Sequence, residues 1–280
     1  MKVLVTGAGG LLGRETVAAF GRAGHDATGV GRDEMDVSDR EQVLRVVSEH
    51  APALVVHPAA LTEVDVCERE PDRAFAVNAE GSRHVAEAAR EVGADLVLVS
   101  TDYVFDGSKG APYVEGDTPN PLQVYGRSKL AGEEAVRTVW DRHWVVRSAW
   151  IYGPGGKNFI SKLPALAAAG AELSAVADQT GSPTYAQDLA EALVVMCRIR
   201  PPYGTYHLTN SGVCTFAELV NHAVRSTGLA VAVKEVSWRD LGRPAVRPGF
   251  TALENEAWAR AGLEPLRDWR QAVEAFVRGS

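Results

Sequence analysis

The chain has 280 residues, of which 46% are hydrophobic and 23% are charged, a composition typical of globular proteins that argues against disorder. Its formal net charge of −7 argues against a general nucleic-acid binder, which normally carries a basic surface. No stretch approaches the ~20 apolar residues of a membrane span, and the first residues lack the long apolar region of a signal peptide, so we expect a cytoplasmic location.

Short apolar runs, typical of buried strands, alternate in the first half with segments of helical periodicity. The expected strands are residues 2–6, 26–30, 54–57, 96–100 and 144–149. The expected helices are residues 11–20, 38–50, 72–92 and 128–139, the second opened by a capping box of Ser38 and Glu41. Such alternation predicts an α/β fold, with a doubly wound parallel sheet of the Rossmann type and helices on both faces.

The alternating pattern ends after Trp150, where proline and glycine divide the chain into shorter pieces. We expect residues 1–150 to form a dinucleotide-binding domain, with a helix over 184–200 packed back on it. Residues 151–183 and 201–280 are expected to form a small C-terminal substrate-binding lobe at the carboxyl edge of the sheet. In this lobe Thr215 and Glu218 form a second capping box, and residues 268–277 a closing helix.

A glycine-rich turn lies between the first expected strand and the first expected helix. Gly7, Gly10 and Gly13 have the spacing Gly-x-x-Gly-x-x-Gly. The first allows a sharp turn, the second lets a pyrophosphate approach the backbone, and the third lets the helix pack closely on the strand. The free N–H groups at the start of the helix attract an anion. The sequence therefore predicts a dinucleotide site here.

The residues after the second strand bear on the choice of cofactor. An acidic residue here would bind the 2′-hydroxyl of NAD. The strand is instead followed by Arg32, suited to a 2′-phosphate, and by Asp33, suited to a ribose hydroxyl. We expect NADPH, with NADH also possible.

A Tyr-x-x-x-Lys motif supplies the expected chemistry. Tyr125 and Lys129 are four residues apart, so on a helix both side chains share one face. The ammonium favours the tyrosinate, which helps the phenol to protonate an alkoxide formed by hydride transfer to a ketone. Thr101 ends the fourth strand, at the edge where such sheets bind ligands, and is placed to polarise the carbonyl.

These residues resemble the extended short-chain dehydrogenases and, more closely, the dTDP-4-dehydrorhamnose reductases. The resemblance extends over nearly the whole chain. It is carried by residues 59–65, 67–68, 76–81, 100–107, 147–153, 158–159, 178–184, 262–263 and 269, of which 100–107 (Ser-Thr-Asp-Tyr-Val-Phe-Asp-Gly) is the most distinctive.

The resemblance implies a role for each matching residue. Those implied for the cofactor are Gly7, Gly10, Leu11, Leu12 and Gly13 at the pyrophosphate, Asp36 and Val37 along the adenine, and Ala59, Ala60 and Thr62 toward the nicotinamide. Tyr125 would donate the proton, and Lys129 would assist it and hold the nicotinamide ribose. Those implied for the sugar nucleotide are Thr101, Asp102, Trp150 and Arg247, the last in a segment with Phe250 and Thr251.

Departures from the family pattern limit what is assigned. Residues 249–251 vary a segment that usually holds Tyr and Ser, and His57-Pro58 replaces a small or polar pair, with His57 expected to be a packed residue. Some family members dimerise through Mg²⁺ held by glutamates, but a complete set cannot be mapped here. The three cysteines are widely spaced and form no cluster with histidine, so no metal is assigned. A homodimer is left open.

The resemblance implies reduction of the C4 keto group of dTDP-4-dehydro-L-rhamnose to dTDP-L-rhamnose by NAD(P)H. Dehydratases of this superfamily need a Glu where Tyr103 stands, and nothing marks an epimerase. Two alternatives remain open. The first is another dTDP-deoxysugar 4-ketoreductase, of an antibiotic or cell-surface sugar pathway. The second is a non-catalytic subunit like the regulatory partner of methionine adenosyltransferase, which would not need Thr101, Tyr125 and Lys129.

Overall fold

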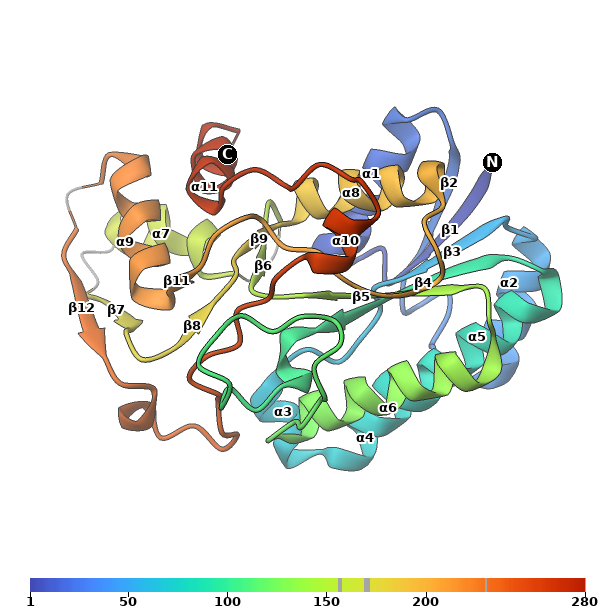
Figure 1. Ribbon diagram of the computed structural model, residues 1–280, viewed down its shortest axis with the longest axis horizontal. Coiled ribbons are helices and arrows are strands. Elements are labelled where there is room, and N and C mark those ends of the chain that lie inside the picture. Colours follow the sequence, from blue (N-terminus) through green and yellow to red (C-terminus); the bar gives the residue numbers. More distant parts are fainter. Residues whose placement is uncertain (156–157, 169–171, 230, 280) are drawn as a thin grey trace.

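The computed structural model describes residues 1–155, 158–168, 172–229 and 231–279, which form a large α/β domain and a smaller lobe (Figure 1). The large domain is built on a six-stranded sheet with the order β10-β5-β4-β3-β1-β2, and all neighbouring strands are parallel. The strands are β1 (Lys2–Thr6), β2 (Asp26–Val30), β3 (Leu54–His57), β4 (Asp95–Thr101), β5 (His143–Ser148) and β10 (Gly204–His207). The predicted doubly wound sheet is confirmed.

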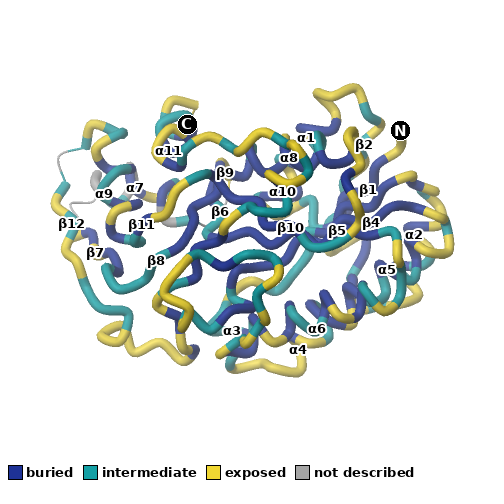
Figure 2. Tube along the Cα trace, in the orientation of Figure 1, coloured by how far each residue is buried: buried dark blue, intermediate teal, exposed yellow. Residues whose placement is uncertain are grey.

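Helices cover both faces of this sheet, which explains why its strands are apolar throughout. One face packs against α1 (Leu11–Arg22) and α8 (Ala186–Ile199), and the other against α2 (Arg40–His50), α5 (Gly81–Val92) and α6 (Val124–Val139). Side chains alternate along each strand, so Val3 and Val5 belong to the first core and Leu4 to the second. Figure 2 shows the strands as a buried layer between half-exposed helices.

The expected helix over 72–92 is not a uniform α-helix. It consists of α4 (Pro71–Phe75), a π-helical turn η1 (Ala76–Glu80) and α5, and it is preceded by the short helix α3 (Val64–Arg69). π-Helical turns inside α-helices often occur at functional sites. Here the turn contains the buried Asn78, whose side chain is used in the site described below.

The predicted capping box at Ser38 is wrong. α2 begins one residue later, and Asp39 is its N-cap, accepting a hydrogen bond from the Gln42 N–H. Ser38 instead donates its hydroxyl to Asp36 Oδ1 at 2.6 Å. The expected box at Thr215 and Glu218 is present at the start of α9 (Phe216–Thr227).

The lobe has its own hydrophobic core, which lies beyond the carboxyl ends of the strands (Figure 1). Its remaining helices are α7 (Phe159–Ala168) and α11 (Trp269–Arg278), with a short 3₁₀ helix η3 (Trp238–Leu241). Its short strands are β6 (Ile151–Tyr152), β7 (Leu173–Val176), β8 (Thr180–Gly181), β9 (Thr184–Tyr185), β11 (Cys214–Thr215) and β12 (Val233–Val236).

Part of the segment expected in the lobe lies in the large domain instead. β10 is the edge strand of the main sheet beside β5, and Trp258 of α10 (Glu256–Arg260) packs in the core formed with α1 and α8. β10 has the sequence Gly-Thr-Tyr-His, which carries no apolar run and so gave no strand signal. Within the described residues no helix is long and apolar enough to cross a membrane.

Candidate active site

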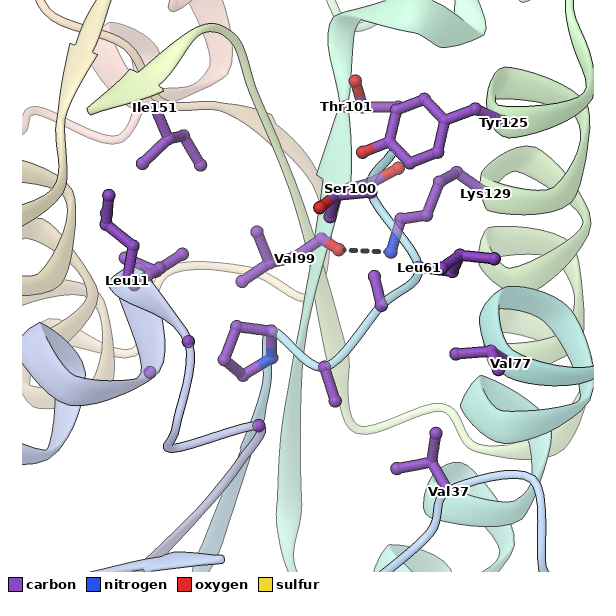
Figure 3. Close-up of a pocket in the computed structure, with 18 of the residues that line it drawn as sticks. Leu11, Val37, Leu61, Val77, Val99, Ser100, Thr101, Tyr125, Lys129 and Ile151 are labelled. Atoms are coloured by element: carbon purple, nitrogen blue, oxygen red, sulfur yellow. Dashed lines mark hydrogen bonds between the residues drawn. The ribbon is translucent and has the colours of Figure 1, made fainter. Parts of the chain in front are cut away.

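A cavity of about 490 Å³ lies at the carboxyl ends of the sheet strands (Figure 3). Its lining contains every residue predicted to hold the cofactor, namely Gly7, Gly10, Leu11, Leu12, Gly13, Arg32, Asp36, Val37, Ala59, Ala60, Thr62, Tyr125 and Lys129. Thr101, Asp102 and Trp150 from the predicted sugar set also line it. The structure thus brings together residues that are up to 143 positions apart in sequence, from Gly7 to Trp150.

The glycine turn forms one end of the cavity. Gly7 has a positive φ of 59°, and its carbonyl accepts the Gly10 N–H at 2.9 Å. A Cβ atom on Gly13 would lie 2.3 Å from the Gly7 oxygen, so only glycine lets α1 start this close to β1. The N-cap of α1 is Gly10, which has no side chain to satisfy the first N–H groups of the helix. These groups therefore fit a pyrophosphate.

The end of β2 supplies one cationic side chain to the cavity. Arg32 is 70% exposed and its Nη2 lies 3.5 Å from Asp36 Oδ2, a contact that is weak at the surface. Hydrogen bonds from Ser38 hold the pKa of Asp36 below its usual value. Asp33 does not line the cavity, which leaves Arg32 and Asp36 as the polar pair beside the expected adenosine ribose.

Further lining residues were not identified from the sequence. They are Met35, Pro58, Leu61, Arg73, Val77, Val99, Ser100, Ser148 and Ile151. Most adjoin predicted residues along the same loop or strand end, so extending each motif by one or two positions would have found them. Arg73 and Val77 come from α4 and η1, and no local motif marks them.

The expected catalytic side chains converge at the opposite end of the cavity from the glycine turn. Tyr125 and Lys129 project from α6 toward Thr101 and Ser100 at the end of β4 (Figure 3). Lys129 Nζ donates a hydrogen bond to the Val99 carbonyl at 2.8 Å. Thr101 Oγ1 accepts the Tyr103 N–H at 3.2 Å and lies 3.0 Å from Asp102 Oδ1, to which it donates.

Burial controls the protonation of this pair. It raises the pKa of Tyr125 above its ordinary value, and the Thr101 hydroxyl opposes that rise. It lowers the pKa of Lys129 to about 8, and the charge of Glu133 opposes that fall. At neutral pH the phenol is therefore protonated and the lysine is mainly an ammonium ion. This is the state needed to give a proton to a ketone that is being reduced.

Helix α6 is held close to the site by two glycines. A Cβ on Gly126 would lie 2.0 Å from the Tyr103 carbonyl oxygen, and one on Gly132 would lie 2.3 Å from that of Asn78. Gly126 also explains why α6 begins four residues before the expected position, because glycine in the first turn weakens the helical signal. Asn78 completes the packing by donating to Ser128 Oγ at 2.9 Å.

Arg247 does not line the cavity, although the sequence predicted it to bind the substrate. Its guanidinium forms a two-bonded ion pair with Asp65 of α3, at 2.6 and 3.0 Å. The same segment does reach the site through Thr251, which donates to Asp102 Oδ2 at 2.5 Å. Arg247 therefore fastens this segment to the large domain, and its charge is already paired.

Asp102, which lines the cavity, and His57, which does not, are both buried. Burial raises the pKa of Asp102 to about 6, and its bonds from Thr251 and Thr101 oppose the rise. His57 lies 2.7 Å from Thr6 Oγ1 through Nδ1, and burial lowers its pKa to about 3, so it is neutral. This agrees with its expected role as a packed residue.

Comparison with known proteins gives one consistent result. Residues 1–280 match the family described as the RmlD substrate binding domain. A dTDP-4-dehydrorhamnose reductase of Streptomyces griseus is 46% identical over 98% of this chain and 92% of its own length. A probable dTDP-4,6-dihydroxy-2-methyloxan-3-one 4-ketoreductase of Streptomyces antibioticus is 38% identical over 99% of this chain and 95% of its own.

A solved structure supports the same relationship. The dTDP-4-dehydrorhamnose reductase of Bacillus anthracis, crystallised in complex with NADP, superimposes with a TM-score of 0.96. The match covers 100% of this chain and 99% of that one, at 35% sequence identity.

Proposed function

The chain belongs to the RmlD substrate binding domain family, and from this premise we propose that it reduces the C4 keto group of dTDP-4-dehydro-L-rhamnose to dTDP-L-rhamnose with NADPH. The observation that carries the proposal is the arrangement of one cavity. A glycine turn suited to a pyrophosphate lies at one end, and Tyr125, Lys129 and Thr101 converge at the other. The glycine turn would hold the pyrophosphate of a dinucleotide in this cavity, and Tyr125, Lys129 and Thr101 would act on the keto sugar.

The residues present fit this cofactor. The close approach at Gly13 and the uncapped start of α1 leave room and N–H donors for a pyrophosphate. Arg32 and Lys129 both line the cavity, where Arg32 would meet a 2′-phosphate and Lys129 would hold a ribose hydroxyl. When bound, NADPH supplies the hydride to C4 of the sugar.

The side chains of this chain manage the proton. Tyr125 Oη gives its proton to the sugar O4 as negative charge develops there, and the Lys129 ammonium stabilises the phenolate that remains. Thr101 is the second donor toward O4. Its hydroxyl hydrogen points to Asp102 in the structure, so it must turn toward the substrate to polarise the ketone.

An assay of product identity tests the proposal. NADPH oxidation is followed at saturating dTDP-4-dehydro-L-rhamnose, and the product is identified by chromatography and NMR. We expect dTDP-L-rhamnose. Oxidation with a different C4 product would favour another deoxysugar 4-ketoreductase, an alternative supported by the relative from Streptomyces antibioticus. Tight dinucleotide binding with no turnover of any keto sugar would favour the regulatory subunit.

Arg32 gives a prediction about cofactor choice. We expect Arg32→Ala to raise the KM for NADPH by about tenfold, because a charge-assisted hydrogen bond contributes about 1.5–3 kcal/mol. The KM for NADH should change little, since NADH has no 2′-phosphate. Steady-state kinetics with both cofactors measures the effect, and Arg22→Ala, at a distant exposed ion pair, is the control. Equal changes for both cofactors would show that Arg32 does not contact the 2′-phosphate.

We also propose a cellular location and an assembly for the protein. We place the reaction in the cytoplasm, where NADPH and nucleotide sugars are produced. A homodimer is the assembly to test first, by sedimentation of the purified protein. No metal is assigned to either the site or an interface.

A further inference from the structure

A buried acidic side chain lies behind the catalytic pair on the same face of α6. Tyr125, Lys129 and Glu133 follow one another at four-residue spacing, so they form one row along the helix. Glu133 is completely buried and does not line the cavity. A buried carboxylate is costly unless it is paired, so its presence needs an explanation.

Glu133 is the centre of a cluster that joins three elements of the fold. Ser100 of β4 donates to its Oε1 at 2.6 Å. Arg147 of β5 donates from Nε to Oε1 at 2.9 Å and from Nη2 to Oε2 at 2.7 Å. Arg137, one turn further along α6, donates to Oε2 at 2.8 Å. We call these four residues the Glu133 cluster.

One member of the Glu133 cluster, Ser100, is a chain neighbour of the catalytic Thr101 on β4. Ser100 lies between Val99, whose carbonyl holds Lys129 Nζ, and Thr101. Fixing Ser100 to α6 therefore fixes the distance between the end of β4 and the helix that carries Tyr125 and Lys129. Arg147 is only 2% exposed and is paired with Glu133, so this carboxylate anchors β5 as well.

We propose that Glu133 is a positioning residue for the reaction: it sets α6 against the ends of β4 and β5 and supplies the buried negative charge that faces the Lys129 ammonium. This inference rests on the proposed reduction, in which Lys129 must be positively charged. Glu133 is one helical turn from Lys129 along α6, and its two carboxylate oxygens are bonded to Arg147 and Arg137.

The other titratable groups around Lys129 do not replace this charge. His57, from β3, is neutral because burial lowers its pKa to about 3. Burial also raises the pKa of Tyr125, on α6 itself, which keeps its phenol uncharged in the free protein. Asp102, directly after β4, is bonded to Thr101 and Thr251, and its charge does not shift the pKa of Lys129. Two effects act on the pKa of Lys129: burial lowers it, and Glu133 raises it.

The test changes the charge without changing the shape. In Glu133→Gln we expect Lys129 to lose its proton about one pH unit lower than in the native protein, because a neighbouring charge shifts a pKa by about one to three units. The alkaline fall in kcat should shift to lower pH by the same amount as the titration of Lys129. The control is Glu134→Gln, which removes a charge from the adjacent exposed position and should move neither.

Two further variants keep the proposal testable if Glu133→Gln does not fold. Arg137→Gln removes a positive partner that is 36% exposed, and should move the titration of Lys129 to higher pH. Glu133→Asp keeps the charge but withdraws it from Ser100 and Arg147, and should lower kcat while leaving the alkaline limb in place. An unmoved titration in Arg137→Gln, with native kcat in Glu133→Asp, would overturn the proposal.

A direct readout separates this inference from the proposed function. The Lys129 titration is followed by NMR of lysine-labelled protein bound to NADP⁺, with Lys129→Met assigning the signal. This measurement needs no turnover, so it stays informative if dTDP-4-dehydro-L-rhamnose proves not to be the substrate. A Lys129 titration that is identical in native protein and Glu133→Gln would overturn the electrostatic role whatever the substrate is.

Discussion

Tyr125→Phe is expected to lower kcat for the keto sugar by roughly 10²–10⁴-fold, the usual contribution of a positioned proton donor. The substitution removes the phenolic oxygen and keeps the ring that lies edge-on to Tyr103, at 6.2 Å between centroids. The substitution does not change the glycine turn at Gly7–Gly13, so the Kd for NADPH should change little. Single-turnover kinetics and fluorescence titration of NADPH measure the two quantities separately.

A matched phenol elsewhere provides the control for this loss. Tyr206 donates its hydroxyl to the Pro202 carbonyl at 2.7 Å and does not line the cavity, so Tyr206→Phe should keep nearly native turnover. If Tyr125→Phe retained native turnover, water or Thr101 would have to donate the proton, and Tyr125 would lose its assigned role. A large rise in the Kd for NADPH would instead show that Tyr125 acts through cofactor binding.

The pH dependence of the native enzyme follows from the same pair. Burial lowers the pKa of Lys129 to about 8, so its charge is present below that pH and is lost as the pH rises through it. Reduction should therefore slow above about pH 8. Tyr125 contributes no loss in the neutral range, because burial raises its pKa. The two residues thus give a rate that declines only on the alkaline side.

The large domain was predictable because its signals are local. The strands over 2–6, 26–30 and 54–57 have the bounds that the apolar runs indicate, and the glycine turn fixes the cofactor end of the site. The start of α2 was mistaken because Ser38 and Asp39 are both good capping residues. In the structure the Ser38 hydroxyl bonds to Asp36, and Asp39 is the N-cap of α2.

The features that escaped prediction depend on contacts between distant segments. Arg247 was expected at the substrate because it falls in a segment that resembles the family's sugar-nucleotide segment, but Asp65 pairs with it across 182 positions. Glu133 resembles any exposed helical glutamate in sequence, and only the fold shows that Ser100 and Arg147 surround it. No periodicity or motif in one sequence reports such pairs.

A second large effect is expected at the glycine turn. In Gly13→Ala the new Cβ would lie 2.3 Å from the Gly7 oxygen and 2.8 Å from Ala8 Cα. Both contacts are with backbone, so α1 must move away from the turn. Overpacking of this kind costs about 1–3 kcal/mol. If this cost destabilises the NADPH complex and not the free protein, NADPH affinity drops by about five- to 150-fold, since 1.4 kcal/mol is a factor of ten.

Gly9→Ala is the control that shows whether any alanine in the glycine turn weakens NADPH binding, or only one that meets the backbone. A Cβ at Gly9 meets no atom within 4 Å, and its backbone does not need a positive φ. We therefore expect native affinity for NADPH in Gly9→Ala, by isothermal titration calorimetry, beside the loss in Gly13→Ala. Equal losses in both variants would mean that the whole loop must stay flexible to bind. Native affinity in Gly13→Ala would mean that α1 can shift without disturbing the N–H groups that hold the pyrophosphate. The start of α1 alone, and not its close packing on the glycine turn, would then account for pyrophosphate binding.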